Sequence, residues 1–126
     1  MGLVKEVIKE IGNKSREFYE FVLPPIDMYL TKDNLKIVID IPGFAKKDIE
    51  LTLCGDVLSI KAEKEIQEKE SDSLICNQRP NVIDKKVRLP IDIKVGEEKI
   101  ESAKYVDGIL TLVIPFTKSG KNISIN

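Results

Sequence analysis

The chain has 126 residues, which gives room for one domain with short extensions. Its 20 basic and 21 acidic residues alternate along the sequence and leave a formal net charge of −1. A nucleic-acid-binding protein needs a basic face for the phosphates, so we expect no nucleic-acid partner. No run approaches the roughly 20 apolar residues of a membrane span and no secretory pattern opens the chain, so we expect a cytoplasmic protein.

The sequence lacks the residues of most catalytic and metal sites. It contains no histidine, which removes Ser-His-Asp and Cys-His nucleophile arrangements together with the commonest transition-metal ligand. Its two cysteines, Cys54 and Cys76, lack metal-ligand spacing, and in a reducing compartment we expect free thiols, one of them half-buried. No glycine-rich phosphate-binding loop is present either. We therefore expect no enzyme, no metal and no cofactor.

Residues 1–22 are predicted to form an amphipathic helix. Apolar residues recur there at steps of three and four, and Pro24 and Pro25 cannot continue the helix. The apolar stripe consists of Val4, Ile8, Ile11, Phe18 and Val22, and it is widened by Val7 and Phe21. An exposed helix with such a stripe must cover it, so either the helix packs on its own domain or it is an arm that packs on other protein chains.

From residue 26 onward the apolar residues alternate with polar ones, which predicts half-buried antiparallel strands. The alternation covers residues 35–41, 49–53, 58–62, 86–89 and 110–114. Gly55-Asp56 and Asp107-Gly108 are typical of two-residue hairpin turns. Seven or more short strands without intervening helices predict an all-β, immunoglobulin-like β-sandwich.

Residues 61–72 are ambiguous, because they are strong helix formers with almost no apolar face. We interpret the first part as the end of a strand and the remainder as a long solvated loop, which in a compact domain is usually functional or mobile. The short apolar run Leu74, Ile75 and Cys76 follows it and could form a small extra strand.

The last residues combine a polar segment with an apolar end. Residues 117–122 are polar and are expected to be flexible, whereas Ile123 and Ile125 are spaced to face one way in an extended strand. One interpretation is a last strand of the same domain, or a terminus without a role. We favour the other, in which the end docks into a groove by strand addition, because a flexible spacer is a poor connector for a packed strand.

Several motifs in this order resemble one family, the small heat-shock proteins with their α-crystallin domain, and the archaeal type in particular. Residues 40–44 (DIPGF) resemble its D-x-P-G-F turn, residues 48–51 fit the strand that follows, and residues 88–90 (RLP) fit its R-x-P strand end. Residues 103–112 (AKYVDGILTL) resemble the signature A-x-x-x-x-G-[VI]-L-T-[VL], and residues 123–125 match the C-terminal I-x-I motif. The resemblance spans about residues 24–126.

The resemblance implies an N-terminal helical arm over residues 1–23, an α-crystallin domain over 24–116 and a C-terminal extension with the I-x-I motif over 117–126. It implies an ATP-independent molecular chaperone, or holdase, that binds unfolding client proteins and prevents their aggregation. Homodimers would assemble into a large homo-oligomer, of 24 subunits in this type. The alternative is a co-chaperone-like β-sandwich binding module that forms no cages, although such modules generally lack the I-x-I tail.

The resemblance also assigns roles to residues. The client-binding arm would consist of Val4, Ile8, Ile11, Phe18, Phe21 and Val22. The dimer exchange strand would consist of Leu74, Ile75 and Cys76. The oligomerisation tail, Ile123 and Ile125, would enter a groove formed by Ile49, Leu51, Leu53, Ile100 and Ser102 of another subunit. Gly108 would form the family's tight turn. Family members often carry an arginine where Asp84, Lys85 and Lys86 stand, so the usual salt bridges at the dimer lack that partner.

Overall fold

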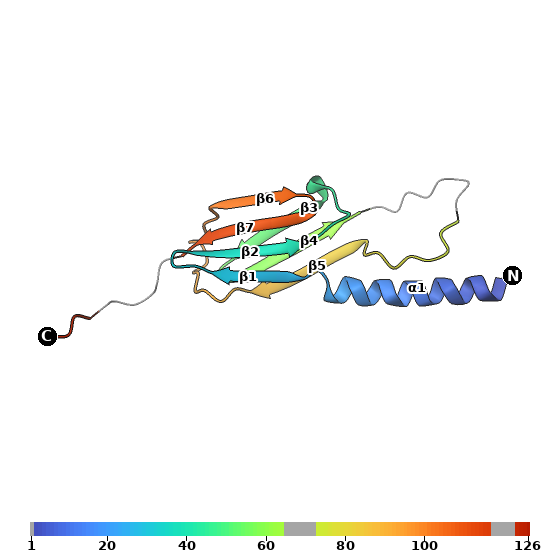
Figure 1. The fold of residues 1–126 in the computed structure, drawn as a ribbon, viewed down its shortest axis with the longest axis horizontal. Helices are drawn as coiled ribbons and strands as arrows, with labels where there is room; N and C mark the ends of the chain where they lie inside the picture. The colour runs from blue at the N-terminus through green and yellow to red at the C-terminus, as the bar shows by residue number, and fades with distance from the viewer. Residues whose placement is uncertain (1, 65–72, 117–122) are drawn as a thin grey trace.

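The structure is a computed structural model that describes residues 2–64, 73–116 and 123–126. The described residues form one long helix followed by seven strands and a short 3-10 turn (Figure 1). The elements are α1 (Gly2–Val22), β1 (Ile26–Leu30), β2 (Asn34–Asp40), η1 (Lys46–Asp48), β3 (Ile49–Cys54), β4 (Val57–Glu63), β5 (Val82–Arg88), β6 (Ser102–Val106) and β7 (Ile109–Pro115). The predicted polar spacer 117–122 and residues 65–72 of the predicted loop lie outside the described residues.

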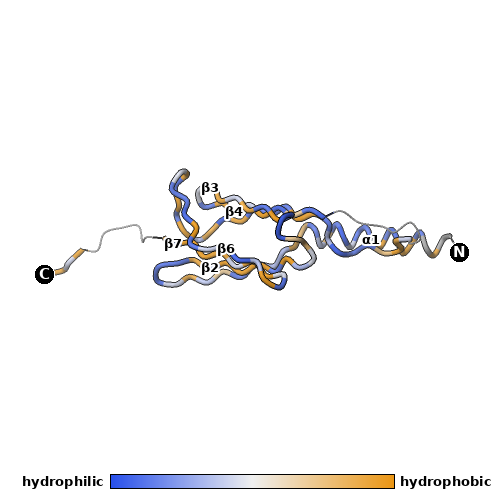
Figure 2. The backbone as a smooth tube through the Cα atoms, turned by 90° about the horizontal axis from the view of Figure 1, so that it is seen from above, coloured by the Kyte–Doolittle hydropathy of each residue, from blue (hydrophilic) through white to orange (hydrophobic). Residues whose placement is uncertain are grey.

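The strands form two antiparallel sheets that pack face to face. One sheet has four strands in the order β1-β2-β7-β6, and the other has three in the order β3-β4-β5. Figure 2 shows the layers edge on, with β3 and β4 in one layer and β2, β6 and β7 in the other. The predicted all-β sandwich with an N-terminal helix is confirmed.

Alternation along the central strands places one apolar face of each sheet in the core. The register of β2 and β7 sets Leu35 opposite Ile114 and Ile37 opposite Leu112, and all four side chains are buried. Successive residues of a strand point to opposite faces, so Lys36 and Val113, which lie between them, point to the outer face of the sheet. The other sheet contributes mainly Leu58, Ile60, Ala62 and Ile83 to the same core.

The turn between β6 and β7 is built around Gly108. Its φ is +79°, and Asp107 before it has a φ of +53°, so both central residues have the positive φ that a type I′ hairpin requires. A Cβ on Gly108 would lie 3.0 Å from Cα and Cβ of Pro42, so the turn also needs a residue without a side chain. The nearby Tyr105 hydroxyl donates to the carbonyls of Ile41, at 2.9 Å, and Phe44, at 2.8 Å. The 103–112 segment therefore fastens the 40–44 turn.

Two expectations about the cysteines and their neighbours need correction. Leu74, Ile75 and Cys76 form no strand in the single chain, because a strand needs a hydrogen-bonded neighbour and none lies beside them. Exchange with a second subunit would supply one, so that role stays a prediction. Cys54 and Cys76 are free thiols as expected, but both are exposed and neither is half-buried.

Glu98 holds the segment between β5 and β6 against the β3-β4 hairpin. Its carboxylate accepts hydrogen bonds from the backbone N–H of Gly55, at 3.1 Å, and of Gly96, at 2.7 Å. These two bonds lower the pKa of Glu98 below its ordinary value, and the bond from Gly55 has the larger effect. A carboxyl whose pKa is lowered by folding stabilises the fold above its unfolded pKa, and this contribution is lost as pH falls through the folded pKa.

We expect the Glu98→Gln variant to lack this acid-sensitive contribution. Its free energy of unfolding should lie below that of the parent chain at neutral pH, and the difference should shrink below pH 4.5, the ordinary value for this group. Denaturant unfolding of the parent chain and of the variant at several pH values measures this difference in the free energy of unfolding. Glu97→Gln is the matched control, because no side-chain hydrogen bond joins Glu97 to the hairpin in the described structure. A constant difference across the pH range would contradict the assignment.

Candidate interaction surfaces

The helix α1 turns its polar side toward its own domain. Gly12 is buried, and a Cβ on it would lie 3.1 Å from Cys76 Sγ and from the backbone N of Asn77. Arg16 and Glu20, one and two turns further on, are half-buried on the same side. Figure 1 shows that only the end of α1 lies near β5, while the rest projects beyond the sandwich. Helix and domain therefore meet through small and polar residues.

The apolar stripe of α1 faces away from the domain. Phe21 is 86% exposed and Phe18 is 61% exposed, although large apolar side chains favour burial. The remaining predicted arm residues, Val4, Ile8, Ile11 and Val22, are exposed as well. The interpretation in which the stripe packs on its own domain is therefore wrong for the single chain.

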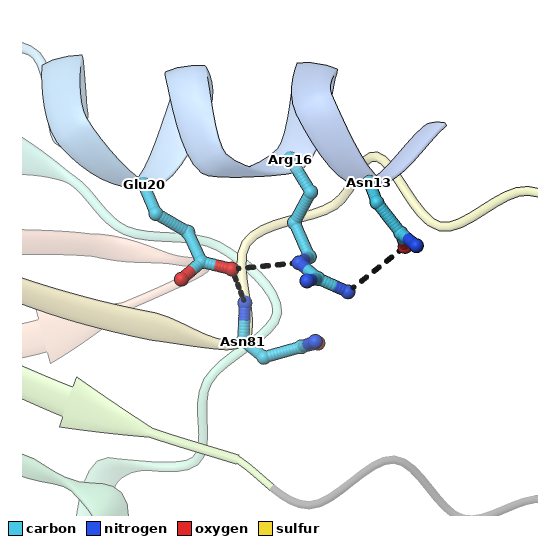
Figure 3. A network of polar contacts seen from close by, with 4 residues as sticks. All are labelled: Asn13, Arg16, Glu20 and Asn81. Atoms are coloured by element: carbon cyan, nitrogen blue, oxygen red, sulfur yellow. Dashed lines mark hydrogen bonds and ion pairs between the residues drawn. The ribbon is translucent and has the colours of Figure 1, made fainter. Parts of the chain in front are cut away.

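A polar network fixes the helix to the start of β5 (Figure 3). Arg16 Nε lies 3.2 Å from Glu20 Oε1, and the backbone N–H of Asn81 donates to the same oxygen at 3.4 Å. Arg16 also donates to Asn13 Oδ1 at 3.4 Å. A carboxylate that accepts both a guanidinium and a backbone N–H fixes the rotation of the helix about its axis, so the apolar stripe is kept outward.

Lys85 binds the end of the helix. In β5, Lys85 shares the inward-facing side of the strand with the buried Ile83 and the half-buried Val87. An apolar residue is expected at such a position. The Lys85 amine donates to the carbonyls of Val22 and Pro24, at 3.3 Å each. The last carbonyls of a helix lack partners within the helix and favour a cation, and α1 has no basic residue in its own last turn. Of Asp84, Lys85 and Lys86, which stand where an arginine was expected from the resemblance, Lys85 thus contacts the arm.

The predicted oligomerisation tail is not covered by any of the residues that the structure describes. Ile123 is 86% exposed and Ile125 is 95% exposed, and Figure 1 places the chain end far from α1. Residues 123–126 form no strand, and the last described strand is β7. The interpretation of the tail as a last strand of the same domain is therefore wrong.

The predicted groove residues lie on two uncovered sheet edges. β3 is one edge of the three-stranded sheet, and Ile49, Leu51 and Leu53 are half-buried at its alternate positions. β6 is an edge of the four-stranded sheet; half-buried Ser102 begins it, and exposed Ile100 precedes it. Figure 1 shows β3 and β6 on the same side of the sandwich. Both edges present backbone groups without a strand partner, as strand addition requires.

The described residues were compared with the requirements of a metal site and of a membrane-spanning helix. They contain no group of three or more acidic or cysteine side chains arranged to hold a metal ion. No helix in the described part of the chain is both long and apolar enough to cross a membrane. What the structure presents are an apolar arm, an apolar chain end and two open sheet edges, which together define a protein-binding β-sandwich.

The comparisons with known proteins agree with this class. The profile of the Hsp20/alpha crystallin family matches residues 27–126, and the chain belongs to this family of small heat-shock proteins, which are chaperones and not enzymes. Two solved structures of mutants of hsp14.1 from Sulfolobus are similar. One is 40% identical, with a TM-score of 0.73 over 90% of this chain and 95% of that one. The other is 44% identical, with a TM-score of 0.68 over 79% and 80%.

Curated relatives are more distant in sequence. The small heat shock protein IbpA of Escherichia coli is 30% identical over 82% of this chain and 75% of its own length. A mitochondrial 26.5 kDa heat shock protein of Arabidopsis thaliana is 28% identical over 91% of this chain, but the match spans only 52% of that protein. The chain therefore spans about half the length of this larger relative.

Sequence reasoning missed the residues that attach the arm. Arg16 and Glu20 stand four residues apart on the polar side of the helix, a spacing that predicts an ion pair. The spacing does not predict that Glu20 also accepts a hydrogen bond from Asn81. Lys85 was noted in the sequence as part of the stretch 84–86, but its inward-facing position in β5 and its contact with the helix end were not foreseen.

Proposed function

We propose that the chain is an ATP-independent holdase that binds unfolding client proteins through the apolar stripe of α1. The observation that carries the proposal is the orientation of this helix: its polar side contacts the domain, and Phe18 and Phe21 are exposed. Burying one such side chain contributes about 1.5–3 kcal/mol, so several of them can hold an exposed apolar segment of a client. No ATP is needed, because the binding surface is already outward.

The same proposal gives the other predicted segments their roles. Leu74, Ile75 and Cys76 would exchange between two subunits to form the dimer, since they lack a strand partner in the single chain. Ile123 and Ile125 would dock beside β3 and β6 of another subunit and join dimers into a large oligomer, for which we propose 24 subunits. The domain limits at residues 23 and 116 separate arm, sandwich and extension. Two exposed free thiols suit a reducing compartment such as the cytoplasm.

The Phe18→Ala, Phe21→Ala double variant tests client binding. We expect it to lose most protection of a heat-unfolded client against aggregation, because two exposed aromatic side chains are removed from the stripe. Light scattering of an aggregating model client, at a fixed ratio of chains, measures the protection. Val95→Ala is the control, since Val95 is 77% exposed but lies outside the arm.

The β-strand signal in circular dichroism should be unchanged in both variants, because neither phenylalanine lies in the core cluster. Full protection by the double variant would refute the client-binding role of the arm. The alternative, a co-chaperone-like module without cages, would be favoured if the unaltered chain gave the mass of a monomer at all temperatures.

A further inference from the structure

A small cavity lies where the end of the arm, the 40–44 turn and the approach to β5 meet. It has a volume of about 140 Å³. Its apolar wall includes Leu23, Ile41, Phe44 and Ile83, and its charged lining consists of the cations Lys64 and Arg79 and the carboxylate of Asp40. None of the roles proposed above uses this cavity.

The two cations converge on one point beside Gly43. The position that a Cβ would take on Gly43 lies 3.0 Å from Arg79 Nη2 and 3.5 Å from Lys64 Nζ. The Lys64 amine also lies 5.2 Å from the centre of the Phe44 ring. Because residue 43 is a glycine, with a φ of +87°, no side chain separates the two charges.

The two cations are only partly offset by the residues that the structure describes, because Asp40 is the one carboxylate among the described lining residues, which leaves a net charge of +1. The ion pairs among them are Lys14 with Glu10, Arg16 with Glu20 and Arg88 with Asp56, so neither Lys64 nor Arg79 takes part in one. Burial and, second, the Arg79 guanidinium lower the pKa of Lys64. Two like charges this close repel each other, and an anion between them would remove the repulsion.

We propose that this cavity binds an organic carboxylate that carries a small apolar group. The carboxylate would lie between Lys64 and Arg79, whose guanidinium can donate two parallel hydrogen bonds to it. The apolar group would contact the walls formed by Leu23, Ile41 and Phe44. A volume of about 140 Å³ leaves room for only a few heavy atoms. A single negative charge also costs less to bring against apolar walls than the double charge of a phosphate.

Saturation-transfer NMR with the full chain tests the site, because it detects a weak ligand on a large assembly. The probe is isovalerate, and isovaleramide is its neutral counterpart of the same shape. We expect saturable binding of isovalerate and none of the amide. The Lys64→Met, Arg79→Met double variant should bind isovalerate at least about tenfold more weakly, because both charge-assisted hydrogen bonds are lost.

The matched control is the Lys86→Met, Arg88→Met double variant, which removes the same charge from exposed positions of β5. Equal weakening in the control would overturn the proposal, as would equal binding of the amide or no saturable binding of isovalerate. Inorganic phosphate is the third probe. Phosphate is added to the isovalerate sample in increasing amounts. If phosphate displaced isovalerate with an affinity equal to that of isovalerate itself, the site would be a general anion site and the apolar part of the proposal would be wrong.

A second measurement does not depend on variants that fold. Acylation of lysines by a limiting reagent, followed by mass spectrometry, reports how accessible each amine is. Isovalerate should slow the acylation of Lys64 relative to Lys86 in the same chain, and isovaleramide should not. An unchanged ratio at saturating isovalerate would contradict the assignment.

Discussion

Replacing Ile123 and Ile125 together by alanine is expected to reduce the assembly to dimers. Each buried isoleucine contributes about 1.5–3 kcal/mol, so one docked tail gains about 3–6 kcal/mol. Ordering the tail costs about 1–2 kcal/mol for each residue, so the net gain of one tail is small. Both side chains are exposed in the single chain, so no residue in the described ranges competes for them. Removing most of their apolar surface makes docking unfavourable, whereas the sandwich is untouched.

Light scattering of the unaltered chain and of the double alanine variant, at equal concentration, gives the mass of each assembly. Ser124→Ala is the control, because residue 124 faces the opposite side of an extended tail and its substitution should leave the mass unchanged. An unchanged mass of the double alanine variant would refute tail docking as the link between dimers. A monomer would instead show that the dimer also depends on the tail.

Many weak links also predict a response to heat. An assembly held by several tails is stable through multivalency, yet each link can open separately. The mass of the unaltered chain in light scattering should therefore fall on heating and recover on cooling.

Replacing Gly108 by alanine is expected to lower the free energy of unfolding by about 2–5 kcal/mol. The φ of +79° costs an alanine about 1–2 kcal/mol. The new Cβ would also lie 3.0 Å from Cα and Cβ of Pro42, which is closer than such atoms normally approach. The turn that contains Pro42 cannot move away freely, because Tyr105 holds the carbonyls on both sides of it. Overpacking of this kind adds roughly 1–3 kcal/mol.

Gly96→Ala separates the two contributions. Gly96 has a comparable φ of +94°, but nothing lies within 4 Å of the Cβ that it would gain. We therefore expect this variant to lose only the backbone part, about 1–2 kcal/mol. Denaturant unfolding at equal chain concentration compares the two. Equal losses would mean that Pro42 moves without cost and that the contact with Gly108 is unimportant.

The sequence by itself determined the helix, the central strands and most of the core, although its alternating runs included neither β1 nor β6. Alternation with period two assigned Leu35, Ile37, Leu110 and their neighbours to inward faces, because a strand shows one face to water and the other to the core. Glycine and aspartate pairs located the β3-β4 and β6-β7 hairpins, since few residues adopt a positive φ. The arm, the open tail and the family followed from local patterns of the same kind.

Only the tertiary structure decided what each exposed segment contacts. Periodicity identified the apolar stripe of α1, but the outward orientation depends on Glu20 meeting Asn81, 61 residues away, and on Lys85 meeting the helix end. The cavity likewise requires Lys64 and Arg79 to converge on Gly43. A polar contact between distant segments leaves no repeating signal in the sequence, because it depends on how the chain returns to the same place. Local patterns show which residues avoid water, and only the fold shows what covers them.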